Sequence, residues 1–467
     1  MRASFFDNRA HLRIHGRFVL AVIAATFLPA IGINARAGLW NSAYYAGWMQ
    51  SYLPAQQVDF TAMTHVIHFA VVPKADGSLD SDVNVITLAN STDVIARAHA
   101  AGVKVLISVG GENSASGFQG ATSAANRPHF VTNIVNFVRS RGYDGVDLDW
   151  EPLNASDAGS FSNLANDLRT ALNAFTPRPL LTVAVASQPS LFASLQTRFD
   201  QINLMTYSLS GPYTGWVTWF NAPIYDGGYR FPSTGQLVPS TDGMVSNFLA
   251  NGVAASKLGI GISFYGYVWS GGTGTSTGGA ALPRQSWTTA PSATEAAYSA
   301  IMSNYFQPQL YFWDTNAQSA YLSIDQIGSA NDKFISYDDE TSCRAKVAYA
   351  NRKGLAGLII WELGGGYRAD QPSGQRDLLL QSVKQALANL FRITSLDLND
   401  DAAVINFSTV AGFDYTIERA DVLTPSSWSA VTSLTADAPG AQVVDANAVS
   451  RSNGFYRIRE VHTISGP

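Results

Sequence analysis

Gly142-Tyr-Asp-Gly-Val-Asp-Leu-Asp-Trp-Glu151 is the stretch of sequence that points most directly to the fold. From Asp147 onward, acids alternate with bulky apolar residues, which is the period of a β-strand. Asp147, Asp149 and Glu151 should therefore share one face of a strand, at intervals of about 6.6 Å. Carboxyl groups buried side by side cannot all ionise cheaply, so we expect raised pKa values and a shared proton in this row.

The end of this row is suited to acid catalysis. An acid with a raised pKa at that position, here Glu151, can protonate a leaving group. A metal site with oxygen ligands and a solvated edge strand are the alternatives. The apolar residues between the acids favour a strand that is apolar on its other face, and the stretch does not match a calcium-binding loop. The row thus favours an acid–base site without a metal.

Short β-branched runs alternate with helical patterns from Trp40 to about Phe391, which predicts parallel strands joined by crossover helices. Eight runs fit this pattern: Ser42 to Gly47, Thr64 to Val71, Lys104 to Gly110, Gly145 to Glu151, Leu180 to Ala186, Gln201 to Tyr207, Leu258 to Phe264 and Gly357 to Glu362. Eight such strands favour an α/β fold, the closed (β/α)8 TIM barrel, with its chemistry at the C-terminal ends of the strands. A doubly wound open sheet is the alternative, but no Gly-x-Gly-x-x-Gly loop follows the first run.

The pattern Asp144-x-x-Asp147-x-Asp149-x-Glu151 resembles the signature of the family-18 glycoside hydrolases, the chitinases and their relatives. The resemblance implies that Glu151 is the general acid and base. It also implies that Asp149 orients the acetamido nitrogen of the substrate and that Asp147 shares the proton of Asp149. Asp144, at the start of the strand, is expected to be structural.

Other strand ends are similar to segments of the same family. Ser108-Val109-Gly110-Gly111 resembles its Ser-x-Gly-Gly segment, where Gly110 and Gly111 let the backbone approach the active-site strand. Met205-Thr206-Tyr207-Ser208 resembles its Met-x-Tyr-Asp segment. By this resemblance Tyr207 bonds the acetamido group and Met205 lines the same pocket. Serine at 208 replaces the usual aspartate, which should change one contact to the acetamido group but not the reaction class.

Three further aromatic residues are expected to contact the substrate. Tyr44 matches a tyrosine in the floor of the site in chitinases, and Trp361 matches the tryptophan under the sugar that is cleaved. Tyr265 belongs to Phe264-Tyr265-Gly266-Tyr267, which is similar to a Phe-Tyr-Gly-Arg segment with tyrosine in place of arginine. Each of these aromatic side chains could instead belong to the core.

The resemblance implies a retaining hydrolase of β-1,4-linked N-acetylglucosamine polymers. In this family the N-acetyl oxygen of the sugar replaces a carboxylate nucleophile. Two alternatives are a non-hydrolytic chitin-binding lectin and an endo-β-N-acetylglucosaminidase acting on N-glycans. The presence of Glu151 argues against the lectin, because such relatives typically lose this glutamate. A long insertion argues against the endoglycosidase.

The chain ends suggest additional segments. Arginines up to Arg17, an apolar run from Phe18 to Ile33 and Ala35-Arg36-Ala37 have the pattern of a signal peptide. We therefore expect residues 1–37 to be removed and the protein to be secreted and extracellular, with an uncleaved anchor as the alternative.

The catalytic barrel is expected over residues 38–391. About ninety residues separate its last two strands, far more than an ordinary connection. Residues 268–333 of this interval resemble the α+β insertion of processive or exo-type chitinases, which deepens the groove. The short alternating runs in 392–467 predict a small β-sandwich similar to fibronectin-III-like accessory modules, which act as spacers or polysaccharide binders.

The composition restricts the choice of partners. A net charge of −5 without a basic stripe does not predict nucleic-acid binding. The single cysteine, Cys343, excludes an internal disulfide, and we expect it to be a small buried residue. We expect a monomer whose partner is chitin or an N-acetylglucosamine oligosaccharide. After signal cleavage it should need no membrane, metal or cofactor.

Overall fold

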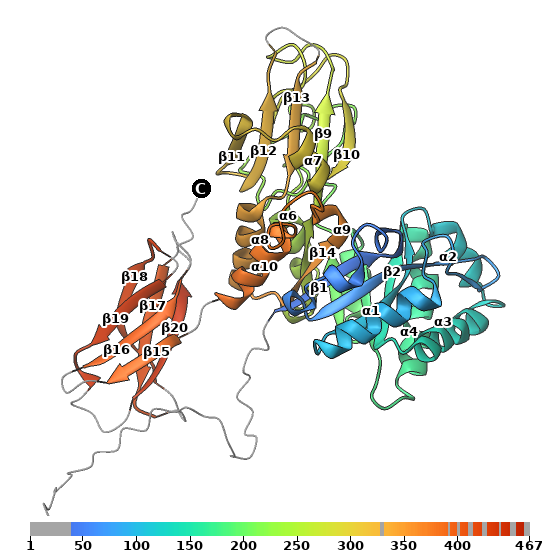
Figure 1. Ribbon diagram of the computed structural model, residues 1–467, viewed down its shortest axis with the longest axis horizontal. Helices are drawn as coiled ribbons and strands as arrows, with labels where there is room; N and C mark the ends of the chain where they lie inside the picture. Colours follow the sequence, from blue (N-terminus) through green and yellow to red (C-terminus); the bar gives the residue numbers. More distant parts are fainter. Residues whose placement is uncertain are drawn as a thin grey trace, which may run out of the picture. The chain divides into compact units, whose positions relative to one another are not determined.

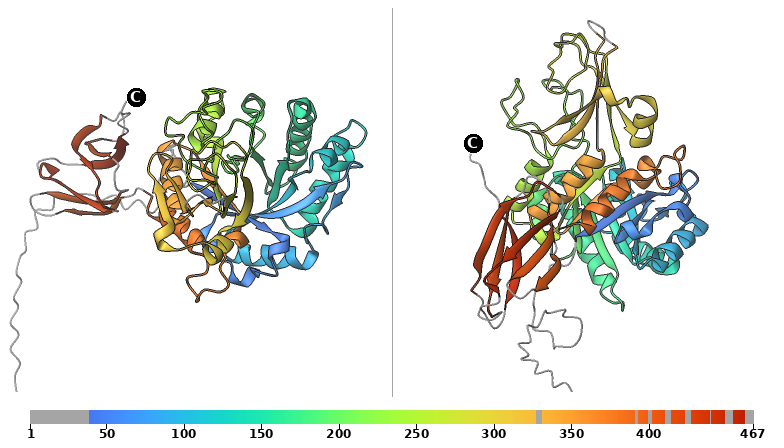
Figure 2. Two further views of the ribbon diagram at one scale, coloured as in Figure 1. Left: turned by 90° about the horizontal axis from the view of Figure 1, so that it is seen from above. Right: turned by 60° about the vertical axis from the view of Figure 1, so that its left-hand side comes forward.

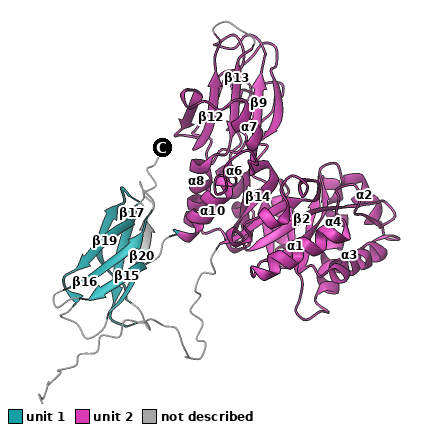
Figure 3. Cartoon of the chain, viewed as in Figure 1, with its two compact units in different colours: residues 1–35, 389–467 teal, residues 36–388 magenta. Residues whose placement is uncertain are grey.

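The computed structural model describes residues 39–326, 331–390, 393–398, 402–409, 414–422, 427–438, 440–448 and 454–461. The chain divides into two compact units, one formed by Arg36–Ala388 and the other containing Asn389–Pro467 (Figure 3). The expected signal peptide, residues 1–37, lies outside the described residues. Each unit is considered separately below.

Eight parallel strands form a closed barrel in the larger unit. In chain order they are β1 (Trp40–Ala46), β2 (His65–Pro73), β4 (Lys104–Gly111), β5 (Gly145–Trp150), β6 (Leu180–Val185), β7 (Gln201–Leu204), β8 (Leu258–Ser263) and β14 (Gly357–Trp361). Around the barrel they follow the order β1-β14-β8-β7-β6-β5-β4-β2, and the pairing of β2 with β1 closes the ring. The predicted barrel is confirmed, and the open sheet is excluded.

Helices surround these strands (Figures 1 and 2). The helix α4 shows why they form, because it buries Phe161, Leu164, Leu168 and Leu172 along one face at helical spacing. The helices of this unit are α1 (Leu88–Ala100), α2 (Ala115–Ala121), α3 (Arg127–Arg141), α4 (Ala158–Leu172), α5 (Pro189–Leu195), α6 (Thr241–Ala250), α7 (Tyr298–Asn304), α8 (Glu340–Arg352), α9 (Leu363–Gly366) and α10 (Leu378–Ala388). The short strand β3 (Leu79–Asp80) pairs with the end of β2.

The register of three neighbouring strands prepares the centre of the barrel. Ser108 of β4 lies beside Asp147 of β5, and Asp147 lies beside Thr182 of β6. Side chains from adjacent strands at the same level point to the same side of the sheet. Two hydroxyl groups therefore flank the first acid of the row.

A five-stranded antiparallel sheet is inserted between β8 and β14, at the top of the view in Figure 1. Its order is β10-β9-β13-β12-β11, from β9 (Tyr265–Ser270), β10 (Ser292–Ala297), β11 (Tyr311–Asp314), β12 (Ser319–Ile324) and β13 (Lys333–Tyr337). The sheet begins and ends a few residues outside the expected 268–333. Tyr265 and Tyr267 consequently belong to its first strand and not to the end of the seventh barrel strand.

The segment between β7 and α6 completes the core of this insertion, which no sequence pattern predicted. Val217, Trp219 and Phe220 from this segment are buried in one cluster with Trp269 and Phe334 from the sheet. The wall of the inserted region is therefore built from two parts of the chain that are separated by β8.

The smaller unit contains two three-stranded antiparallel sheets, with orders β15-β16-β19 and β18-β17-β20. Ile405 and Phe407 of the first sheet share a core cluster with Tyr415 and Ile417 of the second. The strands are β15 (Ile393–Leu398), β16 (Ala403–Ser408), β17 (Asp414–Ala420), β18 (Ser429–Thr435), β19 (Gly440–Asp445) and β20 (Phe455–Val461). Two sheets around one core agree with the expected sandwich, whereas its relation to fibronectin-III modules stays a prediction.

Candidate active site

A cavity of about 740 Å³ lies over the C-terminal ends of the barrel strands. Parallel strands in a closed barrel bring their C-terminal ends to one face, so residues distant in sequence meet there. The predicted site residues that line the cavity are Tyr44, Gly110, Gly111, Asp149, Glu151, Met205, Tyr207, Tyr265 and Trp361. Neither Asp147 nor Asp144 lines the cavity.

Asp147 is fully buried and holds three hydroxyl groups. Its Oδ2 accepts from the Tyr44 hydroxyl at 2.9 Å and from Ser108 Oγ at 3.3 Å, and its Oδ1 accepts from Thr182 Oγ1 at 2.6 Å. Burial raises the pKa of Asp147 to about 6, and the three hydrogen bonds oppose that rise because they favour the charged form. Both of its oxygens are thus occupied.

Asp149 is paired with Glu151, not with Asp147. Burial, followed by the charges of Glu151 and Asp147, raises the pKa of Asp149 well above its usual range. Burial also raises the pKa of Glu151, as does the nearby Glu112, while the hydrogen bond with Asp149 lowers it. Within the row, Asp149 is thus linked by a hydrogen bond to Glu151, whereas Asp147 acts on it through its charge alone. The reason is that the oxygens of Asp147 are taken by hydroxyl groups.

One oxygen of Asp149 lacks a partner. Oδ1 is buried and forms no hydrogen bond with any described residue, although Asp149 lines the cavity. A buried acceptor without a donor is costly, and such an atom is suited to accept from a ligand. The site thus presents an unused acceptor on a carboxyl group whose pKa is raised.

Aromatic rings form the floor of the cavity. The ring of Trp361 lies 5.4 Å from that of Tyr44 and 4.6 Å from that of Phe69. Trp48, which is 40% exposed, meets Phe69 edge-on at 5.8 Å. Such faces suit the apolar C–H surfaces of sugar rings. Tyr44 is part of this floor, although its hydroxyl is committed to Asp147.

Tyr207, Tyr265 and Ser208 also line the cavity. The rings of Tyr207 and Tyr265 meet edge-on at 5.9 Å, and the Ser208 and Tyr265 hydroxyl groups are 2.5 Å apart. Burial raises the pKa values of both tyrosines well above the usual range, so both keep their protons at neutral pH. Tyr267, in place of the family's arginine, donates to Glu295 Oε1 at 3.1 Å.

The remaining predicted residues have structural contacts. Asp144 Oδ2 accepts from the backbone N–H of Val105 at 2.7 Å and lies 2.7 Å from His99 Nε2, before β5 begins. Gly110 has a left-handed φ of 119°, and a Cβ there would lie 2.0 Å from the carbonyl oxygen of Asp149. A Cβ on Gly111 would lie 2.6 Å from the ring of Phe69. Both glycines therefore permit close packing under the site.

Several cavity residues were not predicted from the sequence, namely Phe69, Glu112, Glu295 and, beneath the cavity, Thr182. Phe69 lies at the end of a predicted strand, but its inward direction depends on the register. Thr182 could have been found from the period of two along its strand, which places it beside Asp147. Glu112 directly follows the Ser-x-Gly-Gly segment, which was the available signal.

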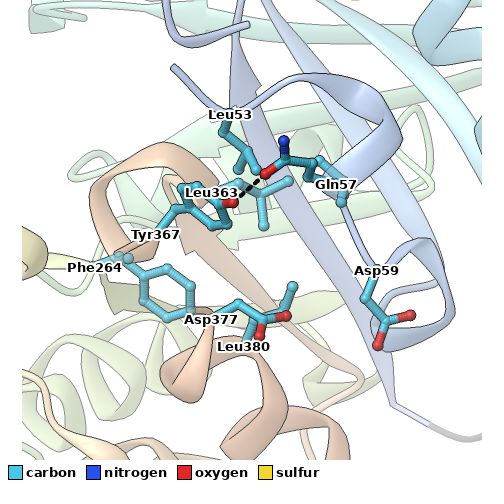
Figure 4. A pocket seen from close by; sticks show the side chains of 10 residues that line it. Leu53, Gln57, Asp59, Phe264, Leu363, Tyr367, Asp377 and Leu380 are labelled. Atoms are coloured by element: carbon cyan, nitrogen blue, oxygen red, sulfur yellow. Dashed lines mark hydrogen bonds between the residues drawn. The ribbon is translucent and has the colours of Figure 1, made fainter. Parts of the chain in front are cut away.

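A second pocket lies between the loop after β1, α9 and α10 (Figure 4). Its volume is about 10 Å³, enough for roughly one water molecule. Leu53, Leu363 and Leu380 line it, and the Tyr367 hydroxyl donates to Gln57 at its edge. This pocket is a small packing gap, and the catalytic cavity is elsewhere.

Two further properties concern metals and membranes. Among the residues that the structure describes, no group of three or more His, Cys, Asp or Glu side chains is arranged to hold a metal ion. Within the same ranges, no helix combines the length and apolar character needed to cross a membrane. Cys343 is buried, as expected.

Comparisons with known proteins give matches over most of the larger unit. The sequence profile of the glycosyl hydrolases family 18 matches residues 41–366. Chitinase A1 of Niallia circulans is 30% identical over 350 residues, which are 66% of this chain and 48% of that protein, so the match spans about half of this relative. The class V chitinase of Arabidopsis thaliana is 27% identical over 383 residues, 77% of this chain and 93% of the relative.

Solved structures share the fold. The Group IV chitinase of Ostrinia furnacalis, solved in complex with allosamidin, superposes with a TM-score of 0.64 at 22% identity and covers 75% of this chain and 99% of its own. The class V chitinase of Nicotiana tobaccum, solved with NAG4, gives 0.61 at 24% identity with coverages of 75% and 99%. At these identities the likeness extends to the fold alone.

Proposed function

Because the chain belongs to glycosyl hydrolase family 18 and is a glycoside hydrolase, we propose that it hydrolyses β-1,4 linkages in chitin or chitooligosaccharides. The relatives it matches are chitinases by name, and their substrate is carried over here as part of this proposal. A further pocket of about 330 Å³ adjoins the cavity and shares the lining residues Val72 and Lys74 with it. This additional room supports a polymer substrate.

The unpartnered Oδ1 of Asp149 is the observation that carries the proposal. An N-acetylated sugar brings an amide N–H, which is the donor this atom lacks. Once that bond forms, the acetamido group is held with its carbonyl oxygen free to attack the anomeric carbon. A sugar without the acetamido group would leave the buried oxygen without a donor.

Glu151 serves as the general acid and base in this mechanism. Burial raises its pKa and so favours the protonated form, which can donate a proton to the glycosidic oxygen while the N-acetyl oxygen displaces the leaving sugar. Asp149 stabilises the positive charge that develops on the acetamido nitrogen, and Asp147 acts on Asp149 through its charge. Tyr207 steadies the acetamido oxygen. Water then opens the cyclic intermediate with retention of configuration.

Replacing Glu151 tests the proposal. Glu151→Gln should lower the release of chitooligosaccharides by about 10²- to 10⁴-fold, since it removes general acid catalysis. The folded variant should still bind chitotetraose, which calorimetry can measure. Glu112→Gln is the matched control, because it removes a carboxylate from the same cavity outside the row and should keep readily measurable hydrolysis.

The same assay separates the competing functions. Release of sugar from a high-mannose glycoprotein but not from chitin would point to the endoglycosidase. Binding of chitin without turnover by the wild-type protein would point to the lectin. Treatment with EDTA should leave hydrolysis unchanged, and loss of activity would mean that the acids hold a metal.

We further propose that the protein is secreted and that its smaller unit is an accessory module, a spacer or polysaccharide binder similar to fibronectin-III modules. The basic and apolar pattern of residues 1–37 supports secretion. Mass spectrometry of the exported protein should find a new N-terminus after Ala37. An intact leader on the exported protein would contradict this prediction.

A further inference from the structure

Ser208 adopts a backbone conformation that serine seldom takes. Its φ is 54°, in the left-handed region, where a side chain crowds the following carbonyl oxygen. The residue directly follows Tyr207 and lines the cavity. Strained residues of this kind persist only where their surroundings fix them, and they concentrate at functional sites. The contacts that hold Ser208 are therefore of functional interest.

Asn221 supplies that fixation. Its Oδ1 accepts from the Ser208 backbone N–H at 2.9 Å. Its Nδ2 donates to Ser263 Oγ at 3.1 Å and to the Tyr265 carbonyl oxygen at 3.3 Å. Asn221 is fully buried and lies in the segment between β7 and α6. One side chain thus ties the residue after Tyr207 to the end of β8 and the start of β9.

A buried ion pair anchors the other side of this network. Asp338 Oδ2 accepts from both the backbone N–H and the Oγ of Ser263 at 2.9 Å, and it lies 2.5 Å from Lys346 Nζ. Both members of the ion pair are completely buried. Breaking such a pair from one side is strongly unfavourable, so Ser263 is held rigidly. Asn221 is consequently connected to a fixed point of the barrel.

The result of these contacts is a pair of neutral hydroxyl groups at the cavity. Ser208 Oγ and Tyr265 Oη are 2.5 Å apart, and both residues line the cavity beside Tyr207. Asn221 contacts both residues through their backbones. Neither hydroxyl group carries a charge at neutral pH, and each can donate and accept.

We propose that Asn221 is a positioning residue for the substrate: it holds Ser208 in the left-handed conformation and thereby places the Ser208–Tyr265 hydroxyl pair to bind the N-acetylated sugar. This role rests on the proposed function and extends it to the recognition of one sugar unit. Asn221 itself does not line the cavity and acts on the sugar through Ser208, whose hydroxyl group is paired with that of Tyr265.

A double-mutant cycle tests this role with chitotetraose as the substrate. Asn221→Ala should raise KM about tenfold, the size of a lost hydrogen-bonded contact, with kcat within about threefold of wild type. Ser208→Ala, at an exposed position that should not impair folding, should raise KM by a similar factor. In the Ser208→Ala background, Asn221→Ala should raise KM little further, since both act on one contact.

Stability measured on the same variants separates positioning from a purely structural role. Asn221→Ala should lower Tm in both backgrounds, whereas its effect on KM should appear only when Ser208 is present. Asn41→Ala is the matched control, because Asn41 is equally buried and its Nδ2 bonds the Ala62 carbonyl oxygen away from the cavity. It should lower Tm without changing KM.

Three results would overturn the role. If Ser208→Ala left KM unchanged, the positioning role of Asn221 would be wrong, even if Asn221→Ala could not be obtained in folded form. Additive effects on KM in the double variant would also overturn it, while leaving the proposed function intact if the wild-type protein is active. A wild-type protein that does not hydrolyse chitotetraose would overturn the proposed function and this role together.

Discussion

Three acids of one strand face have separate chemical environments. Asp147 is held by three hydroxyl groups, whereas Asp149 is hydrogen-bonded to Glu151 and keeps one oxygen unpaired. The period of two in the sequence predicted that these residues would share a face. It could not predict which two acids are hydrogen-bonded to each other, because the hydroxyl groups that occupy Asp147 come from Tyr44 and Thr182 on other strands.

The pH dependence of stability should reflect this row. The pKa values of Asp147, Asp149 and Glu151 are all raised on folding, so the native state keeps protons that the unfolded chain releases. Their contribution to stability is therefore full below the unfolded pKa values of about 4 and is lost as the pH rises through about 6 and above. Each group can contribute a slope of at most about 1.4 kcal/mol per pH unit.

Asp149→Asn removes one of these groups, so the free energy of unfolding should decline less steeply as the pH rises. Denaturant unfolding at pH 4, 6 and 8 would measure the free energy of unfolding, and the variant should gain on the wild type as the pH rises. Asp226→Asn, in a half-buried turn position outside the row, is the control for the change from Asp to Asn itself. A difference between Asp149→Asn and wild type that is constant with pH would contradict the expected linkage.

At the scale of elements, the barrel strands were predicted from their local pattern, whereas β10 was not. The alternation in β5 and the runs of the other barrel strands are visible in short windows of sequence. Ser292–Ala297 is rich in alanine and glutamate, which favour helix, yet it forms β10 because it pairs with β9 along its whole length. Long-range pairing outweighs local propensity there.

Gly110 and Gly142 provide a matched test of close approach between elements. Both have left-handed φ angles, 119° and 81°, but a Cβ would collide with the Asp149 carbonyl at Gly110 and would meet open space at Gly142. Gly142→Ala should therefore cost about 1 kcal/mol of stability, from backbone strain alone. Gly110→Ala should cost several times more, because β4 and β5 must move apart. Comparable Tm values for the two variants would contradict this account.

At the scale of the whole molecule, the sequence predicted two folded parts, and the structure divides the chain after Ala388. The larger unit has its own closed barrel and contains the complete cavity. The site was largely predictable because strand ends converge in a barrel. The segment between β7 and α6 was not, because its role arises only from packing against the inserted sheet.

Truncation should separate the two units. A chain ending at Ala388 should hydrolyse chitotetraose with kcat/KM within about twofold of the full chain and should keep the thermal transition of the barrel, because the described residues of the core cluster around Tyr44 and of the cavity lining all precede Ala388. Its activity on solid chitin would show whether the smaller unit binds polysaccharide. A large loss on chitotetraose would mean that the units depend on one another.

The shared core of the insertion has a practical implication for building chimeras. Trp219 and Phe220 precede β8, whereas Trp269 and Phe334 follow it, and all four occupy one hydrophobic cluster. A graft that moves only the interval between β8 and β14 into a homologue would transfer Trp269 and Phe334 without Trp219 and Phe220, with which they pack. Successful domain exchange in this protein requires both crossover segments to be transferred as one module.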